Sequence, residues 1–258
     1  MIPLFTLRLI FGMALTWCLA PRQQITSGFF RIQMLVTLGL SVLSWLTLGQ
    51  LTPEDAPQPT GFMALQVGTL LLAALSFVGS VYWTLERRLG GTRLAFAIAL
   101  LSALLVIVAT QARQVEGTSL SRLHDIGGAL SAGWLIGGTT SAMLLGHWYL
   151  TATGMPLQPL IRMNQWFGVA AGVRMLFSIW SLTQADLSQL GTVELSWMLL
   201  RWMGLIGPMV LAWLVVRILR YRNTQSATGV LYAATILVFM GEMAATLLAQ
   251  SGHFPLWP

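Results

Sequence analysis

The sequence predicts an all-α fold, a polytopic membrane helix bundle with eight transmembrane helices. Of its 258 residues, 56% are hydrophobic and only 9% are charged, whereas a soluble domain carries about 25% charged residues. The apolar residues form runs of about 20, the length that a helix needs to cross a hydrocarbon core of about 30 Å. These runs are predicted as helices, because an isolated strand would leave its backbone groups unpaired in lipid.

The eight predicted spans follow one another along the chain with short loops between them. The first span lacks a basic start and its positive charges follow the apolar run, so it does not resemble a cleavable signal peptide. In order, the spans are 2–20, 29–50, 61–84, 93–112, 124–150, 160–183, 195–219 and 227–250.

The loops alternate in charge, which supports the number of spans. Those after spans 1, 3, 5 and 7 are rich in Arg, and their only acid is Glu86. The positive-inside rule places these loops in the cytoplasm, so both termini are predicted outside, which for a bacterial inner membrane is the periplasm. The Arg-rich side holds Arg22, Arg31, Arg87, Arg88, Arg93, Arg162, Arg217, Arg220 and Arg222. The opposite side holds Glu54, Asp55, Glu116, Asp125, Asp186 and Glu194, with Arg113 and Arg122.

The positive net charge therefore reflects topology and does not indicate a nucleic acid partner. All 14 basic residues are Arg, and they form short clusters without the continuous basic stripe that nucleic acid binding requires. The expected partners are the lipid bilayer and other membrane subunits. Cys18 is the only cysteine, so we expect neither an intrachain disulfide nor a Cys-ligated metal site.

The two halves of the chain align as a tandem repeat. The early spans match when Trp17 is aligned with Trp148, and the later spans match when Gly68 is aligned with Gly204. Each half holds four spans, an even number, so both halves have the same orientation. The prediction is a parallel repeat of two four-helix units; chance similarity between apolar helices is the alternative. The two units are residues 1–112 and 113–258.

Most of the charge inside the predicted spans belongs to the second unit. A charged side chain in a span is unfavourable and usually faces the bundle interior or a polar cavity. At about 1.5 Å per residue, three such residues on three helices lie about 20–23 Å from the cytoplasmic side. They predict a polar centre in the outer half of the membrane. The three are Arg174, Arg201 and Glu242, and a fourth charge inside a span is Arg8.

The repeat supports a binding site over a purely architectural role, because the first unit has apolar residues at the corresponding positions. Two Arg and one acid leave a positive charge that a haem propionate, a lipid headgroup or a carboxylate substrate could neutralise. A quinone carbonyl could also accept a hydrogen bond from Arg. The alternatives are a network that only locks three helices together and, for Arg201, extension to the interface. The counterparts of Arg174, Arg201 and Glu242 are Leu43, Leu65 and Val106.

A second polar group is predicted on the cytoplasmic side. His147 lies at the end of span 5, and Asn164 and Gln165 begin span 6 near the same face. The three could form a pocket in which His147 acts as a headgroup ligand or a proton carrier. The alternative is that His147 belongs to an aromatic belt with Trp148 and Tyr149 at the interface.

The histidines limit the haem hypothesis. His124 and His147 lie at opposite ends of span 5, about 35 Å apart on one helix, and cannot ligate the same iron. His124 and His253 could meet only if the tail folds over the outer face, while a His/Met pair stays open. Asp125, next to His124, is interpreted as an acidic cap at the start of span 5.

The layout of four plus four spans resembles that of haem A synthases in helix count. This resemblance implies paired histidines in each half, whereas the first half of this chain contains no histidine. The activity of that family is therefore not carried over.

Three functional hypotheses stay open. The first is a ligand- or redox-cofactor-binding subunit of a membrane complex, which holds a quinone, haem or lipid among spans 5–8. The second is a proton-coupled small-molecule transporter with Glu242 as the titrating group. The third is a structural or assembly subunit without a ligand. The sequence contains no nucleophile elbow or catalytic triad pattern, so it leaves open whether the protein is an enzyme.

Overall fold

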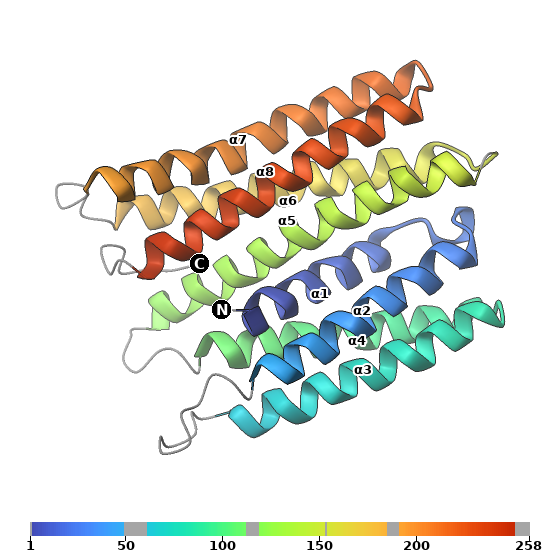
Figure 1. The fold of residues 1–258 in the computed structure, drawn as a ribbon, viewed down its shortest axis with the longest axis horizontal. Coiled ribbons are helices and arrows are strands. Elements are labelled where there is room, and N and C mark those ends of the chain that lie inside the picture. Colours follow the sequence, from blue (N-terminus) through green and yellow to red (C-terminus); the bar gives the residue numbers. More distant parts are fainter. Residues whose placement is uncertain (1, 49–60, 112–118, 153, 185–190, 251–258) are drawn as a thin grey trace.

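A computed structural model describes residues 2–48, 61–111, 119–152, 154–184 and 191–250. Within these ranges the chain forms eight α-helices and no strand, with a 3-10 turn, η1 (Arg22–Gln24), between the first two helices. The helices lie along one common direction, and the chain reverses between consecutive helices (Figure 1). Their bounds are α1 (Ile2–Leu19), α2 (Ser27–Leu48), α3 (Phe62–Thr84), α4 (Arg88–Gln111), α5 (Ser119–Thr151), α6 (Gln158–Thr183), α7 (Thr192–Arg220) and α8 (Thr224–Gln250).

The predicted all-α bundle of eight helices is confirmed, since each predicted span overlaps one helix of the structure. Seven of the helices have the length and the apolar composition needed to cross a membrane. By this measure the protein is a multi-pass membrane helix bundle. The largest differences concern the starts of α4 and α5. These helices begin at Arg88 and Ser119, whereas the sequence placed their starts at residues 93 and 124.

α5 is the helix that does not meet this test of composition, and its position explains why. Its middle is rich in Gly, Ser and Thr, and more than half of its residues are buried. It packs against α1, α4, α6 and α8, which separate it from the lipid. A helix enclosed by protein does not need the apolar surface that lipid contact demands, and small residues allow close approach of its neighbours.

The eight helices form two groups of four that meet along α1 and α5 (Figure 1). In each group consecutive helices are neighbours, and the fourth helix packs back against the first. The contact between the groups depends on glycine. A Cβ atom at Gly12 would lie 1.8 Å from the carbonyl oxygen of Gly133, and one at Gly137 would lie 2.2 Å from the backbone nitrogen of Met13. The backbones of α1 and α5 can therefore touch only because these positions lack side chains.

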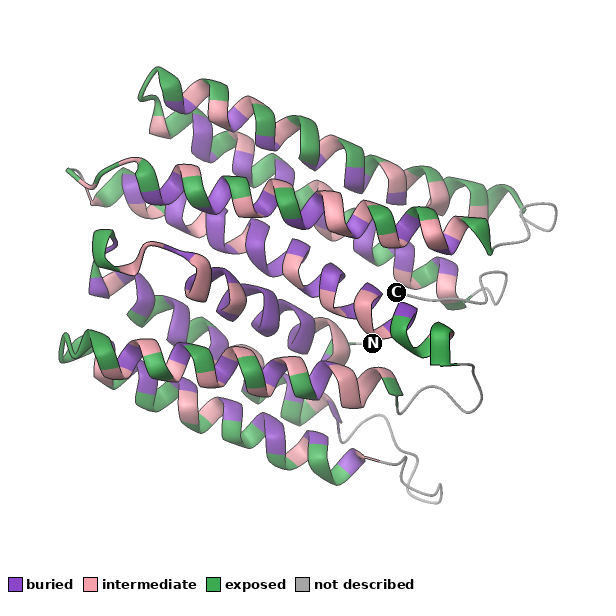
Figure 2. Ribbon diagram, turned by 180° about the vertical axis from the view of Figure 1, so that it is seen from behind, coloured by how far each residue is buried: buried purple, intermediate pink, exposed green. Residues whose placement is uncertain are grey.

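Burial follows this arrangement. Figure 2 shows the buried residues concentrated in the central helices and the exposed residues on the outer ones. Many exposed side chains are large and apolar, among them Leu46, Leu100 and Leu199. Such a surface is what a helix bundle presents to lipid.

When the two predicted units are aligned with Gly68 on Gly204, a helix start and a residue with positive φ fall at matching positions in both units. α4 begins at Arg88 and α8 begins at its counterpart Thr224. Glu86 and its counterpart Arg222 are the non-glycine residues with positive φ in the described chain, and both have φ 55°. The α3–α4 and α7–α8 corners thus share an unusual backbone conformation. These coincidences favour the tandem repeat and its two units, which stay a prediction.

Candidate functional site

Arg174 and Glu242 form a buried ion pair between α6 and α8. Arg174 Nε donates to Glu242 Oε1 over 2.7 Å, and Nη2 donates to Oε2 over 2.8 Å. The Arg174 side chain is completely buried and Glu242 is 6% exposed. Both carboxylate oxygens are therefore engaged by one guanidinium, which is the geometry with the greatest strength and directionality for this pair.

Arg201 of α7 joins the same group of charges through a serine. Its Nη2 donates to Ser178 Oγ over 3.0 Å, and that hydroxyl donates to the backbone oxygen of Arg174, also over 3.0 Å. Arg201 also interacts electrostatically with Arg174 and Glu242. The structure thus brings together the three charged residues that share one predicted depth.

Two glycines hold α7 and α8 close enough for this arrangement. A Cβ atom at Gly204 would lie 2.4 Å from Gly241 Cα, so the two backbones are in direct contact one turn from Arg201 and next to Glu242. Pro208 lies inside α7 one turn further along. Because proline removes a backbone hydrogen bond, it permits a local bend in a membrane helix.

Arg8 of α1 is the charged residue that sequence reasoning left out of the site. It is 7% exposed, and its positive charge acts on Glu242 together with those of Arg174 and Arg201. Like Arg201, Arg8 lies within about three turns of the start of its helix, on the side where α1 begins. This shared depth was the signal available in the sequence. Three guanidinium groups therefore surround one carboxylate.

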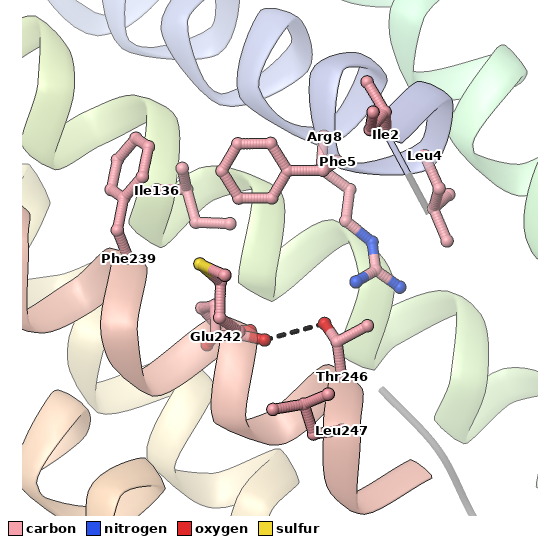
Figure 3. A pocket seen from close by; sticks show the side chains of 10 residues that line it. Ile2, Leu4, Phe5, Arg8, Ile136, Phe239, Glu242, Thr246 and Leu247 are labelled. Carbon is pink, nitrogen blue, oxygen red and sulfur yellow. Dashed lines mark hydrogen bonds between the residues drawn. The ribbon is translucent and has the colours of Figure 1, made fainter. Parts of the chain in front are cut away.

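A cavity of about 400 Å³ lies between α1 and α8 and reaches α5 at Ile136. We call it the α1–α8 cavity. Its polar groups belong to Arg8, Glu242 and Thr246, and Figure 3 shows the Arg8 guanidinium pointing toward Thr246. The Thr246 hydroxyl donates to the backbone oxygen of Glu242 over 2.8 Å. The other lining residues are Ile2, Leu4, Phe5, Ile136, Phe239, Met243 and Leu247.

The cavity exists because α1 and α8 stand apart. Phe5 and Phe239 meet edge to face with ring centroids 5.3 Å apart, but the two backbones hardly approach each other. In the first group the equivalent helix, α4, packs directly against α5. The two sides of the central α1–α5 pair are therefore closed differently.

The predicted cytoplasmic-side pocket does not form as expected. His147 is exposed, and its Nδ1 lies 3.3 Å from the Tyr232 hydroxyl. Asn164 is buried and donates from Nδ2 to the backbone oxygen of Ala212 over 2.8 Å. Gln165 is exposed. Consecutive residues of a helix point about 100° apart, so Asn164 faces α7 while Gln165 faces outward.

The interpretation of Asp125 as a helix cap is corrected by the structure. α5 begins at Ser119, so Asp125 lies well inside the helix and is buried. Its Oδ1 lies 3.4 Å from Nδ1 of His124. The His124 ring packs edge to face on Phe177 and Trp180 of α6. His124 therefore connects α5 to α6.

The donors for haem or a metal are separated in the described chain. No group of three or more His, Cys, Asp or Glu side chains comes together there. Neither His124 nor His147 lines the α1–α8 cavity, and His253 lies outside the described residues. Comparison with models of protein families, with curated proteins and with solved structures finds no match for this chain.

Proposed function

We propose that this membrane protein binds an anionic amphiphile, a molecule with an apolar tail and a carboxylate or phosphate head, in the α1–α8 cavity. The observation that carries the proposal is the cavity itself, which is apolar apart from a guanidinium, a carboxylate and a hydroxyl. Its volume of about 400 Å³ falls within the range of about 300–1,000 Å³ typical of ligand pockets.

The charge balance favours an anionic head. The carboxylate of Glu242 interacts electrostatically with the guanidinium groups of Arg174, Arg201 and Arg8. Charge buried in a low-dielectric region is unfavourable unless it is compensated. An anionic head bound in the cavity would meet the Arg8 guanidinium and the Thr246 hydroxyl, which both line it.

The same observations rank the other hypotheses. A quinone could fill the apolar part of the cavity, but it is neutral and would interact less strongly with the guanidinium of Arg8 than an anionic head would. Haem would find only Met243 as an axial donor on the described wall. Proton-coupled transport through Glu242 is less favoured, because Arg174 holds both carboxylate oxygens and thereby favours the charged form. A structural subunit without a ligand needs no such cavity.

We also propose an orientation in a bacterial inner membrane. The α1–α2, α3–α4, α5–α6 and α7–α8 connections lie at one end of the bundle (Figure 1), and these are the Arg-rich connections. The positive-inside rule favours the cytoplasm for this end. The α1–α8 cavity, near the start of α1 and the end of α8, would then lie in the outer half of the membrane.

The experiment that tests the binding proposal is native mass spectrometry of the protein purified in mild detergent, combined with identification of the co-purifying molecules. The expected result is retention of an anionic amphiphile by the wild type. Arg8→Gln should weaken retention by removing the guanidinium, and Leu247→Trp should weaken it by filling the cavity.

Two matched variants control for general effects. Arg122→Gln removes an exposed Arg near the start of α5, and Met240→Trp places the same ring on α8 outside the cavity lining. Neither should alter retention. Equal losses in all four variants, or no bound amphiphile in the wild type, would contradict the proposal and favour a structural role. A retained quinone would favour a redox subunit.

A further inference from the structure

A second hollow lies at the opposite end of α1 from the α1–α8 cavity. It has a volume of about 470 Å³ and lies between η1 and the α3–α4 corner. We call it the Arg22–Arg88 hollow. In the described chain, six of its lining residues have side chains that carry hydrogen-bond donors: Arg22, Gln23, Gln24, Trp83, Arg88 and Thr92.

The two arginines of the hollow are each fixed through one nitrogen. Arg22 Nη1 donates to the backbone oxygens of Trp17 and Cys18 at the end of α1, over 3.3 and 3.2 Å. Its guanidinium also stacks over the Phe96 ring at 5.0 Å. Arg88 Nη1 donates to the backbone oxygen of Arg22 over 3.2 Å. Each guanidinium has five N–H groups, so most of them stay available to a ligand.

A buried indole forms part of the wall of the hollow. Trp83 is 1% exposed, and its Nε1 has no hydrogen-bond partner among the described residues. The ring is held in place by stacking on Phe30, with centroids 4.5 Å apart. Its Nε1 would lie 2.8 Å from a Cβ atom at Gly91, a residue that does not line the hollow, so the indole contributes a wall to the hollow and not a donor. Glu86, the acid of the α3–α4 corner, does not line the hollow.

We propose that the Arg22–Arg88 hollow binds a phosphate group. The charged side chains that line it in the described chain are guanidinium groups, and a planar guanidinium can bind two oxygens of a tetrahedral phosphate with paired hydrogen bonds. The hollow lies at the Arg-rich end of the bundle, where basic pockets bind the headgroups of anionic lipids. The phosphate belongs either to such a lipid or to a soluble phosphate compound.

The second unit does not repeat this site. In the alignment of Gly68 with Gly204, Arg88 corresponds to Thr224 and Trp83 corresponds to Leu219. At the α7–α8 corner, the backbone N–H of Ser226 donates to Asn223 Oδ1 over 2.9 Å. This hydrogen bond stays within the corner itself. Arg88 and Trp83 thus have no equivalent side chain at the aligned positions of the second unit, although that corner carries arginines elsewhere.

The test compares Arg88→Gln with Arg87→Gln. Both variants remove one exposed positive charge from the same corner, but Arg87 does not line the hollow. Binding of inorganic phosphate is measured by titration calorimetry on the protein in neutral detergent. Retention of phosphatidylglycerol is measured by native mass spectrometry after release from nanodiscs that contain this lipid and phosphatidylcholine.

We expect Arg88→Gln to weaken one of these two interactions about tenfold or more, because it removes a charge-assisted donor, and Arg87→Gln to leave it within about twofold. Phosphate binding would identify a soluble ligand, and phosphatidylglycerol binding alone a lipid. Arg8→Gln should not alter this binding, which separates the hollow from the α1–α8 cavity. Equal effects of Arg87→Gln and Arg88→Gln, or no binding of either probe by the wild type, would overturn the proposal.

Discussion

The clearest prediction concerns the ion pair between Arg174 and Glu242. The change is Glu242→Val, which introduces the residue that the first unit has at the corresponding position, Val106. It removes the acceptor of two hydrogen bonds of 2.7 and 2.8 Å and leaves a completely buried guanidinium without its carboxylate. Hydrogen bonds to charged groups contribute about 1.5–3 kcal/mol each. Loss of one partner of a buried ion pair costs about 3–5 kcal/mol, and we expect this decrease in the free energy of unfolding.

The double variant Arg174→Leu/Glu242→Val distinguishes an ion pair from simple loss of packing. It replaces both partners with the apolar residues of the first unit, so no charge of the pair stays uncompensated, and we expect a loss of less than about 2 kcal/mol. Unfolding in mixed micelles of SDS and dodecyl maltoside, followed by the fluorescence of the 11 Trp residues, measures the double variant and the two single variants, Glu242→Val and Arg174→Leu. The reasoning is refuted if Glu242→Val costs less than about 1 kcal/mol or if the double variant loses the sum of the two single variants.

Two further predictions concern packing and topology. Gly204→Val should lower the free energy of unfolding by at least about 1–3 kcal/mol, because its Cβ would lie 2.4 Å from Gly241 Cα; Gly172→Ala, with no atom within 4 Å of the added Cβ, should leave stability unchanged or raise it by up to about 1 kcal/mol. The topology is tested with Arg87→Cys in a Cys18→Ser background. This exposed cysteine should react with a membrane-impermeant maleimide only after the inner membrane is opened. Labelling in intact spheroplasts would contradict the proposed orientation.

The helices could be predicted from the sequence because lipid contact has a strong compositional signature. Apolar runs indicated eight spans, and Arg at alternate loops separated them. The start of α5 at Ser119 could not be found in this way. Its first turns are exposed at Leu120, Arg122 and Leu123 and then become buried at His124, so neither the apolar length nor the loop charge marks the boundary.

The sequence predicted the depth of the charged residues in the membrane, but not which side chains they contact. Counting residues along each helix placed Arg174, Arg201 and Glu242 at one level. It could not assign Glu242 to Arg174 and leave Arg201 with Ser178, because the rotation of each helix depends on packing. Arg8 was missed for a related reason. The sequence does not show that α1 faces α8 across a cavity.

The two groups of four helices differ at positions that the predicted repeat aligns, and this difference links the charges to the cavity. In the alignment of the two units Arg8 corresponds to Thr139 of α5, and Glu242 corresponds to Val106 of α4. Both counterparts are completely buried, and the Thr139 hydroxyl donates to its own helix at the oxygen of Leu135 over 2.6 Å. There α4 packs on α5 directly. On the other side, where the same two positions are charged, α8 stands away from α1 and the cavity opens. The charges therefore occur at the interface that is not closed by helix packing, which is where a ligand, and not a neighbouring helix, would complete the structure.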